Sequence, residues 1–428
     1  MRVLLTGANG FLGSAILARL LGEGHDVVAI TRSKSAGLSA ITNIEVDIAK
    51  ATLPEHWIPH LRGIDAVINC AGLLQDGPGQ SVRNVHFAGV AALFAACEKS
   101  GVRRVIHISA IGVDRAQPSA FSQTKLEGDR ALMQRELDWV ILRPSVVVGR
   151  STYGGSALFR GLAALPILPV LPDTGQLQIV SLDDVVRTVL FFLSPNAPAK
   201  VAIDLPGRET YSFTEVVLTF RQWLGWRAPY VLPLPRPLAR LAFRFGDLLG
   251  LLGWRPPTRS TAAAEMVRGA TGNFEEWQRI TGIHPASLRD FLAAEPASVQ
   301  ERWFAPLYFL KALGLGVFAL FWIATGLISL GPGWTIGKSL MFEGGVEEPL
   351  ATLAVVGGAL SDICIGVLIA FRRTARAGLL AALAISLVYA VIGTILVPRL
   401  WADPLGPMLK IWPVIAFNLM LLAVLRDR

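Results

Sequence analysis

The chain has few charged residues and few cysteines, and each shortage excludes a class of protein. Only 17% of its 428 residues are charged and 52% are hydrophobic, a balance that is typical of proteins with membrane segments. The three cysteines, Cys70, Cys97 and Cys364, lie far apart and show no metal-ligand spacing. We therefore expect no disulfide framework and no metal site.

Long basic runs are also absent, although basic residues outnumber acidic ones. The chain has 40 Lys and Arg against 32 Asp and Glu, which gives a formal net charge of +8 at pH 7. The arginines are scattered, without the run of five or more basic residues that is typical of nucleic-acid patches. We therefore expect no nucleic-acid partner, and we expect the positive charge to face an anionic lipid bilayer.

The start of the chain carries a glycine-rich turn between an apolar strand and a helix. Residues 3–13 read VLLTGANGFLG, with glycines at positions 7, 10 and 13. In such a unit the first glycine makes the tight turn, the second admits a pyrophosphate close to the backbone, and the third lets helix and strand pack closely. The helix N-terminus then faces the phosphates. Because a second strand is expected over residues 26–31, the pattern predicts a dinucleotide site.

The residue after that second strand indicates which dinucleotide binds. An NAD-specific site usually carries Asp or Glu there to bind the ribose 2′-hydroxyl. This chain has Arg32, followed by Ser33 and Lys34. A guanidinium can bind a 2′-phosphate through two parallel N–H groups, so we expect NADP(H) in preference to NAD(H). The alternative is that Arg32 is a solvated surface residue.

Strands and helices continue to alternate through the first third of the chain. Four further strands are expected at residues 44–48, 66–70, 104–109 and 139–142, with a helix at residues 85–99. This alternation predicts an α/β fold with a Rossmann-type, doubly wound parallel sheet, whose ligand binds at the carboxyl ends of the strands. We expect this core over residues 1–150, and a cap over residues 151–300 that completes the domain.

An ordered series of short motifs resembles the short-chain dehydrogenase/reductase (SDR) family, in its extended and atypical branch. The motifs are TGANGFLG at 6–13, VDI at 46–48, NCAG at 69–72, HISAIG at 107–112, KLEGD at 125–129 and ILRPSVVVG at 141–149. That branch includes the dinucleotide-binding accessory subunit of respiratory complex I. The resemblance implies that three groups of residues contact the pyrophosphate, the adenine and the ribose of the nucleotide, in that order: Gly7, Asn9, Gly10, Phe11 and Gly13; Asp47 and Ile48; Ala71 and Gly72.

The tyrosine that the family uses for proton transfer is missing. Members pair this Tyr with a Lys four residues later, which binds the nicotinamide ribose and lowers the Tyr pKa. Here Lys125 remains, but Phe121 stands in the place of the Tyr and has no proton to give. By the same resemblance, Ser109 stands close to the family's polarising hydroxyl.

Two interpretations follow from the missing phenol. In one, another group supplies the proton or the chemistry needs none; Tyr153, in the loop after the sixth strand, is the nearest substitute, and His86 and Ser122 are weaker ones. In the other, the domain keeps NADP(H) as a structural or redox-sensing ligand. An epimerase or dehydratase of nucleotide sugars is disfavoured, because that chemistry normally relies on the missing phenol.

A basic amphipathic helix is expected within residues 233–254. Apolar residues recur at helical spacing, and Arg236, Arg240 and Arg244 stand four apart. Such a helix can lie in the headgroup plane of a membrane, in which case the substrate would be lipid-soluble. The alternative is a cap helix with its apolar stripe on the core.

Four apolar stretches reach the ~20 residues that span a bilayer, at about residues 304–330, 350–371, 375–397 and 408–425. They predict an all-α four-helix transmembrane bundle over residues 301–428. Its length, helix count and small residues resemble the DoxX-like family of small bacterial membrane domains. Asp362 is the only carboxylate well inside a stretch, and a quinone, proton or helix-pairing role is open for it.

The charges of the loops predict the topology. The loop between the second and third stretches carries Arg372, Arg373 and Arg376, and the C-terminus carries Arg426 and Arg428. By the positive-inside rule both termini and the nucleotide domain face the cytoplasm, so we expect a multi-pass protein of the bacterial inner membrane. The leading hypothesis is an NADP(H)-binding, SDR-like oxidoreductase that acts on a lipid-phase substrate such as a quinone or isoprenoid. The alternative is a non-catalytic NADP(H)-binding module of a membrane-protein complex.

Overall fold

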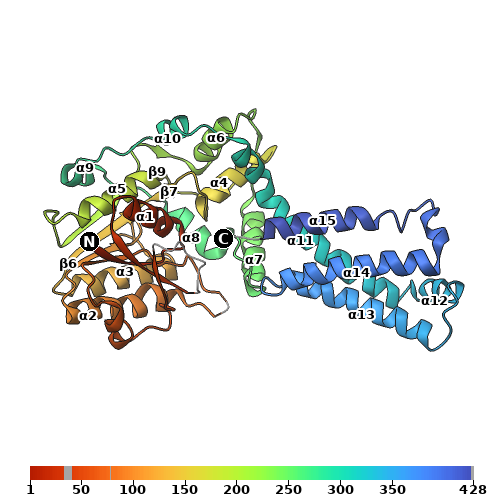
Figure 1. The fold of residues 1–428 in the computed structure, drawn as a ribbon. Coiled ribbons are helices and arrows are strands. Elements are labelled where there is room, and N and C mark those ends of the chain that lie inside the picture. Colours follow the sequence, from red (N-terminus) through yellow and green to blue (C-terminus); the bar gives the residue numbers. More distant parts are fainter. Residues whose placement is uncertain (33–40, 78, 426–428) are drawn as a thin grey trace. The chain divides into compact units, whose positions relative to one another are not determined.

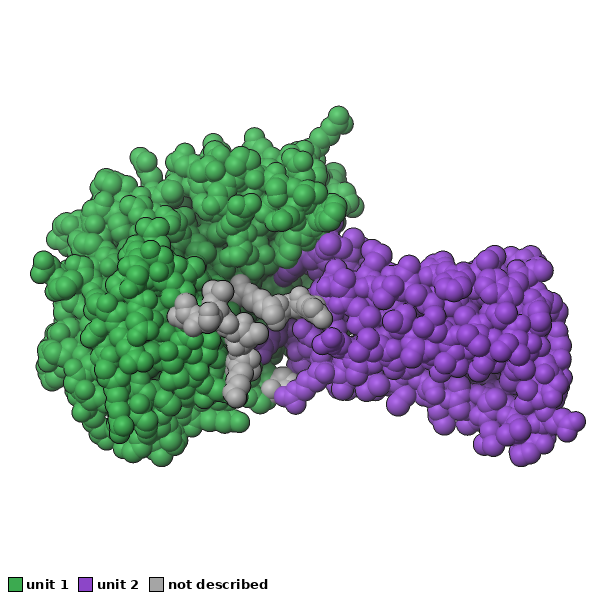
Figure 2. Space-filling model, in the orientation of Figure 1, with its two compact units in different colours: residues 1–248, 256–305 green, residues 249–255, 306–428 purple. Residues whose placement is uncertain are grey.

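The computed structural model describes residues 1–32, 41–77 and 79–425. It divides into two compact units, one of residues 1–248 and 256–305 and one of residues 249–255 and 306–428 (Figure 1, Figure 2). Four residues used in the predictions above, Ser33, Lys34, Arg426 and Arg428, lie outside the described residues.

The first unit is built on a seven-stranded parallel sheet, which confirms the predicted Rossmann-type α/β fold. The strand order is β10-β6-β5-β4-β1-β2-β3, and every neighbouring pair is parallel. The strands are β1 (Arg2–Thr6), β2 (Asp26–Thr31), β3 (Thr42–Glu45), β4 (Ala66–Asn69), β5 (Arg104–Ile108), β6 (Asp138–Pro144) and β10 (Val201–Leu205). The order reverses between β1 and β4, and ligands of such sheets bind in the crevice at that reversal.

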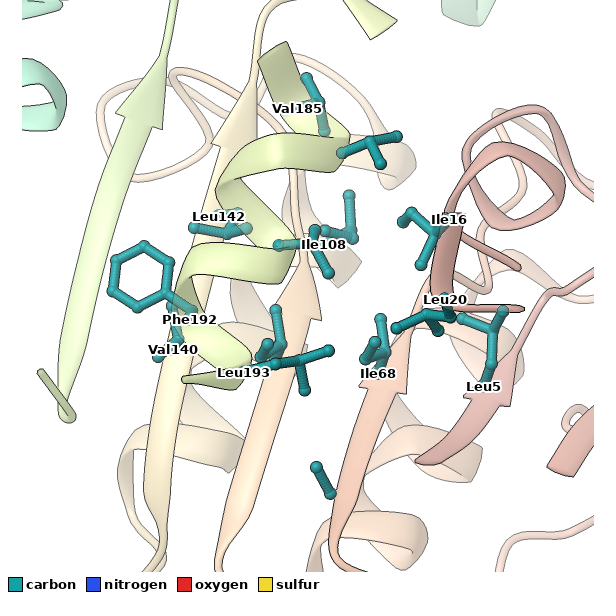
Figure 3. Close-up of a cluster of buried hydrophobic side chains, with 14 of the residues drawn as sticks. Leu5, Ile16, Leu20, Ile68, Ile108, Val140, Leu142, Val185, Phe192 and Leu193 are labelled. Carbon is teal, nitrogen blue, oxygen red and sulfur yellow. The ribbon is translucent and has the colours of Figure 1, made fainter. Parts of the chain in front are cut away.

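Helices cover both faces of the sheet. Helices α1 (Phe11–Gly22) and α5 (Leu182–Leu193) pack on one face, where Figure 3 shows Ile16 and Leu20 of α1 and Phe192 of α5 beside the side chains of the central strands. Helix α2 (Gly89–Ser100) and Leu132 of α3 (Ala120–Met133) pack on the other face. Because both faces are covered, the central strands β1, β2, β4 and β5 are mostly buried and apolar.

The remaining elements of the first unit form the cap. Two small sheets have the strand orders β11-β9-β7 and β12-β8. The elements are, in chain order, β7 (Val146–Val148), α4 (Gly155–Ala164), β8 (Ile167–Val170), β9 (Leu177–Ser181), β11 (Thr210–Tyr211), α6 (Phe213–Trp223), β12 (Tyr230–Pro233), α7 (Arg236–Leu251), α8 (Ser260–Arg268), α9 (Glu275–Thr281) and α10 (Leu288–Ala294).

The second unit is helical. Its helices are α11 (Val299–Leu330), which begins in the first unit, α12 (Trp334–Glu343), α13 (Leu350–Ala370), α14 (Ala375–Leu396) and α15 (Ile411–Leu425). Among the described residues three helices, α11, α13 and α14, are long and apolar enough to cross a membrane. The fourth span that the sequence predicted, over residues 408–425, is longer than the helix found there. The helix begins only at Ile411 and has 15 residues, fewer than the ~20 that span a bilayer.

Small residues let the long helices approach closely. A Cβ added at Gly326 of α11 would lie 2.4 Å from the Ala359 carbonyl oxygen of α13, and one added at Gly366 would lie 2.6 Å from that of Ala319. Close backbone approach of this kind is the usual basis of helix packing in membranes. Asp362 of α13 is buried and accepts a hydrogen bond of 2.9 Å from the Tyr389 hydroxyl of α14. The carboxylate therefore joins two helices of the bundle.

Candidate functional site

The glycine turn lies at the carboxyl end of β1, in the crevice between β1 and β4. Gly7 has a φ of +67°, and a Cβ added there would lie 2.9 Å from the Ala71 backbone nitrogen. A Cβ at Gly13 would lie 2.1 Å from the Gly7 carbonyl oxygen, so helix and turn touch through their backbones. Gly10, the N-cap residue of α1, has no side chain to cap the helix. The first N–H groups of α1 are therefore available to a phosphate.

The residues expected at the adenine and ribose follow the neighbouring strands. Asp47 and Ile48 come after β3 rather than within it, because the Asp47 carboxylate accepts the Ala49 N–H at 3.1 Å and turns the chain. Ala71 and Gly72 come directly after β4. The exposed side chain of Arg32 stands at the end of β2, next to β1 in the sheet. These positions are thus at the same edge of the sheet as the glycine turn.

Two more predicted pyrophosphate residues belong to the turn itself. Asn9 is exposed at its tip, and Phe11 is the first residue of α1. Their roles, like those of the adenine and ribose residues, stay predictions.

Lys125 lies close to the edge of the sheet that holds the glycine turn. Its Nζ donates a hydrogen bond of 2.8 Å to the Ile108 carbonyl oxygen at the end of β5. A Cβ added at Gly72 would lie 3.6 Å from that Nζ, so α3 brings Lys125 to the segment expected at the ribose. Burial lowers the pKa of Lys125 to about 8, although the nearby Asp129 carboxylate opposes the shift. The side chain therefore remains an ammonium group at neutral pH.

His86 occupies the space beside Phe121, and its two ring nitrogens are both engaged. It lies in a single π-helical turn, Asn84–Ala88, and its ring meets that of Phe121 edge-on at 5.5 Å. Nε2 accepts the Leu73 N–H at 2.9 Å. Nδ1 lies 3.0 Å from the Thr124 hydroxyl, which itself donates to a backbone carbonyl oxygen and so accepts the Nδ1 proton.

This bonding makes His86 a neutral side chain of fixed tautomer. Burial, together with the charge of Lys125, lowers the pKa of His86 well below its usual value. Its one ring proton is held by Thr124. His86 therefore supports the backbone before α2 and does not fit the role of a substitute acid.

A buried polar chain that the sequence analysis missed runs under the strand ends. The Thr6 hydroxyl donates to the Asn69 Oδ1 at 2.5 Å, and the Asn69 amide bonds the Nδ1 of His107 at 2.8 Å. The Nε2 of His107 then faces the Oδ1 of Asp129 at 3.5 Å. Burial lowers the pKa of His107 well below its usual value, so the ring is neutral. The Nε2–H and the Asp129 Oδ1 nevertheless make no hydrogen bond of good geometry.

Asp129 and Arg143 form the charged end of this chain. The Arg143 Nε and Nη2 each lie 3.0 Å from the Asp129 Oδ2. Burial raises the pKa of Asp129, and Arg143 partly offsets the shift. Ser109 is close enough to lower that pKa as well, but its buried hydroxyl makes no hydrogen bond of good geometry. The Ser109 hydroxyl therefore lies beside the Asp129 carboxylate, just after the end of β5.

The two remaining candidates are Ser122, one turn before Lys125 on α3, and Tyr153. The Ser122 hydroxyl donates to the Glu265 carboxylate of α8 at 2.8 Å, which commits it to a contact between α3 and the cap. Tyr153 stands between β7 and α4, and its side chain is 56% exposed whereas Lys125 is 5% exposed. A role for Tyr153 stays a prediction. Among the described residues no cluster of His, Cys, Asp or Glu could hold a metal ion.

Two protein families match this chain, one in each of the two units described above. A family described as NAD(P)H-binding matches residues 7–160, and the DoxX-like family matches residues 319–419. Together with the sheet topology, these matches show an NAD(P)H-binding Rossmann-type domain followed by a C-terminal DoxX-like domain. The three apolar helices and the DoxX-like match indicate association with a membrane.

Individual relatives align with part of the chain. The chain is 24% identical over 236 residues to ceramide reductase of Caulobacter vibrioides, covering 55% of this chain and 74% of that protein. It is 24% identical over 263 residues to the photosystem II assembly factor Ycf39 of Guillardia theta, covering 59% of this chain and 79% of that one. The chain spans about a quarter, 26%, of the length of the mycobacterial relatives that it matches.

Solved structures share the fold. MoeE5 in complex with UDP-glucuronic acid and NAD superposes with a TM-score of 0.53 at 22% identity, covering 68% of this chain and 97% of that one. At this level of identity the similarity concerns the fold of the first unit and not its substrate.

Proposed function

We propose that the chain is a membrane-anchored oxidoreductase of the SDR type that reduces a lipid-phase acceptor, such as a quinone or an isoprenoid, with NADPH. The observation that carries the proposal is a buried ammonium group, Lys125, close to Gly72 at the edge of the sheet that holds the glycine turn. Phe121 occupies the position of the tyrosine that serves as the acid in the SDR family. NADPH supplies the hydride, which together with one proton from water converts a quinone to a hydroquinone and leaves NADP⁺.

The missing acid bears on the choice of acceptor. An isolated ketone that takes up a hydride becomes a strongly basic alkoxide, which needs a positioned proton donor. A quinone becomes a phenolate, whose conjugate acid resembles a phenol with a pKa of about 10. Such a product can take its proton from water. A buried positive charge at Lys125 would stabilise the negative charge as it develops.

Two further observations favour a lipid-phase acceptor. The nucleotide domain is joined to a domain with three apolar helices of spanning length, so the chain would meet apolar substrates at the bilayer. A relative is named as a reductase of ceramide, which is itself a lipid. Both observations support the substrate class and leave the individual substrate open.

Substitution Lys125→Met tests the role of the ammonium group. We expect NADPH oxidation by a quinone analogue, measured with the full chain in lipid nanodiscs, to fall by about 100-fold in kcat, because charge stabilisation is lost. In the unsubstituted chain kcat should fall as pH rises through about 8, where Lys125 loses its proton. An unchanged kcat in the variant, or a rate that rises through that pH, would remove Lys125 from the reaction.

Arg32 is proposed to select the phosphorylated nucleotide. We expect Arg32→Glu to weaken NADPH binding by about 10- to 100-fold and to leave NADH binding nearly unchanged, because only NADPH carries the 2′-phosphate. Calorimetric titration of both nucleotides measures the ratio. Arg130→Glu, at an exposed position on α3, is the control for net charge. Equal losses for NADPH and NADH would contradict the assignment.

A second function is favoured by the geometry around Phe121. Because His86 has no proton to give, the site could hold NADP(H) as a structural ligand or a redox sensor in a membrane-protein complex. A relative is named as an assembly factor, which supports this possibility. It predicts that NADPH co-purifies with the chain and stays reduced when quinones of different chain length are supplied in lipid.

We propose that the nucleotide domain faces the cytoplasm of a bacterial cell and that the helices lie in its inner membrane. The support is the turn between α13 and α14, which carries Arg372 and Arg373. In that orientation the domain meets the cellular NADPH pool.

A further inference from the structure

Helix α7 carries large apolar side chains on a face that nothing in the described residues covers. They recur at positions i, i+3, i+7 and i+10, and their exposed fractions are 53% for Leu238, 63% for Leu241, 59% for Phe245 and 55% for Leu248. We call these four residues the α7 stripe. The sequence left open whether these residues pack on the core of the first unit. In the structure they do not.

The opposite face of α7 fixes the helix to the cap. Ala239 is buried, and a Cβ added at Gly246 would lie 1.7 Å from the Thr258 carbonyl oxygen. The Asp247 carboxylate accepts hydrogen bonds from the Arg259 guanidinium, at 3.2 Å, and from the Ser260 N–H, at 3.2 Å. The helix is thus held against rotation, so the stripe cannot turn inward.

The chain directly after the stripe belongs to the membrane unit. Residues 249–255 cluster with that unit, at the turn where α13 ends and α14 begins. Trp254 donates a 2.7 Å hydrogen bond from Nε1 to the Ala370 carbonyl oxygen, and the Arg372 N–H donates to the Leu252 carbonyl oxygen at 3.0 Å. Helix ends that carry Trp and Arg are typical of the membrane–water interface. The segment that follows the stripe is therefore bonded to helix ends of this kind.

We propose that α7 lies on the bilayer surface, with the α7 stripe in the acyl-chain boundary and with Arg240 and Arg244 at anionic lipid headgroups. Both arginines are exposed and lie on the flank between the stripe and the buried face. Arg236 is not included, because its guanidinium already bonds Asp173 through two contacts of 2.9 Å. Apolar side chains flanked by arginines are the usual pattern of helices that bind in the plane of a membrane.

This membrane contact does not depend on any reaction at the proposed NADPH site. It is a second membrane contact, in addition to the spanning helices, and it is made by the cap. A second copy of the chain is the other occupant that could cover an apolar stripe. The flanking arginines and the continuity with the membrane boundary favour lipid.

Photolabelling by lipids tests the proposal without NADPH or turnover. The full chain is reconstituted in nanodiscs of phosphatidylcholine and phosphatidylglycerol whose acyl chains carry a diazirine, and labelled peptides are mapped by mass spectrometry. Leu53 and Val267, which are 55% and 57% exposed elsewhere in the first unit, are the internal control. We expect at least about ten times more label on the α7 stripe than on these two, because interfacial helices are buried among the acyl chains.

Two variants separate the parts of the proposal. Phe245→Ser combined with Leu241→Ser should reduce the label on α7 to the level of Leu53, with the label on α13 unchanged. Arg240→Gln combined with Arg244→Gln should remove the increase in α7 label that phosphatidylglycerol gives over phosphatidylcholine alone. Label on α7 no higher than on Leu53, or cross-links from α7 to a second copy, would overturn the proposal. Label that does not respond to anionic lipid would overturn the assignment of the two arginines.

Discussion

Gly13→Ala is expected to weaken NADPH binding by about 100-fold or more, because the added Cβ would lie 2.1 Å from the Gly7 carbonyl oxygen. The clash is with backbone, so no side-chain rotation relieves it, and the turn or α1 must shift. Either shift moves the N–H groups of the first helical turn away from the phosphates. Titration of the purified full chain with NADPH, followed by nucleotide fluorescence, measures the loss.

The same helix offers a matched control. A Cβ added at Gly22, near the end of α1, meets nothing within 4 Å. Gly22→Ala should therefore bind NADPH as the unsubstituted chain does, while it shares any general effect of alanine on α1. If Gly13→Ala bound NADPH as tightly as Gly22→Ala, the nucleotide would not lie on this turn.

Arg143→Met is expected to lower the free energy of unfolding of the first unit by about 3–5 kcal/mol, because it removes the guanidinium that bonds the buried Asp129 carboxylate. Asp129 is fully buried, and the two contacts to Arg143 are both 3.0 Å. Chemical denaturation followed by far-UV circular dichroism measures the change. Arg103→Met is the control, because the Arg103 guanidinium also bonds a carboxylate through two nitrogens, that of Asp138, but on the surface, where such pairs contribute little.

The pH dependence of this variant has a defined sign. Burial raises the pKa of Asp129 in the folded chain, so folding favours the protonated carboxyl, and its destabilising effect grows as pH rises through that pKa. Removing Arg143 should raise the pKa further. The stability deficit of Arg143→Met should therefore shrink as pH is lowered from neutral. A deficit that is constant with pH, or that grows in acid, would show that Asp129 is not the source of the loss.

Parts of the structure that depend on local pattern could be predicted from the sequence. The glycine spacing and the alternation of strands and helices suffice for the sheet and for the turn at Gly7, because each depends on neighbours along the chain. The position of Lys125 followed from a motif. Its hydrogen bond to Ile108 and its lowered pKa did not, because both depend on burial among elements far apart in the sequence.

The functions of polar residues in the interior were harder to predict. His86 was considered as an acid, but its tautomer is determined by Thr124 and by the Leu73 N–H, which only the fold brings together. Asp129 and Arg143 stand inside the quoted motifs and were not assigned a role. The signal was a carboxylate and a guanidinium within apolar segments, since buried charges are normally paired.

The apolar helices show a different limit of sequence patterns. Periodicity identified α7 as amphipathic but could not decide which face packs on the protein. The small residues Ala239, Gly246 and Gly250 recur on one side of the helix and would have indicated the packed face. The fourth apolar stretch was predicted to begin at about residue 408, but α15 begins at Ile411, close to Pro413, a residue that is favoured in the first turn of a helix.

We propose that one chain binds NADPH on the turn at Gly7 and delivers its electrons to an acceptor dissolved in the bilayer. The most direct measurement is an anaerobic single turnover, in which NADPH-loaded full chain in nanodiscs is mixed with a lipid-soluble quinone and NADPH absorbance is followed. We expect one equivalent of NADPH per site to be oxidised in the presence of quinone and none to be oxidised without it. Bound NADPH that remains reduced with every quinone supplied would contradict the claim.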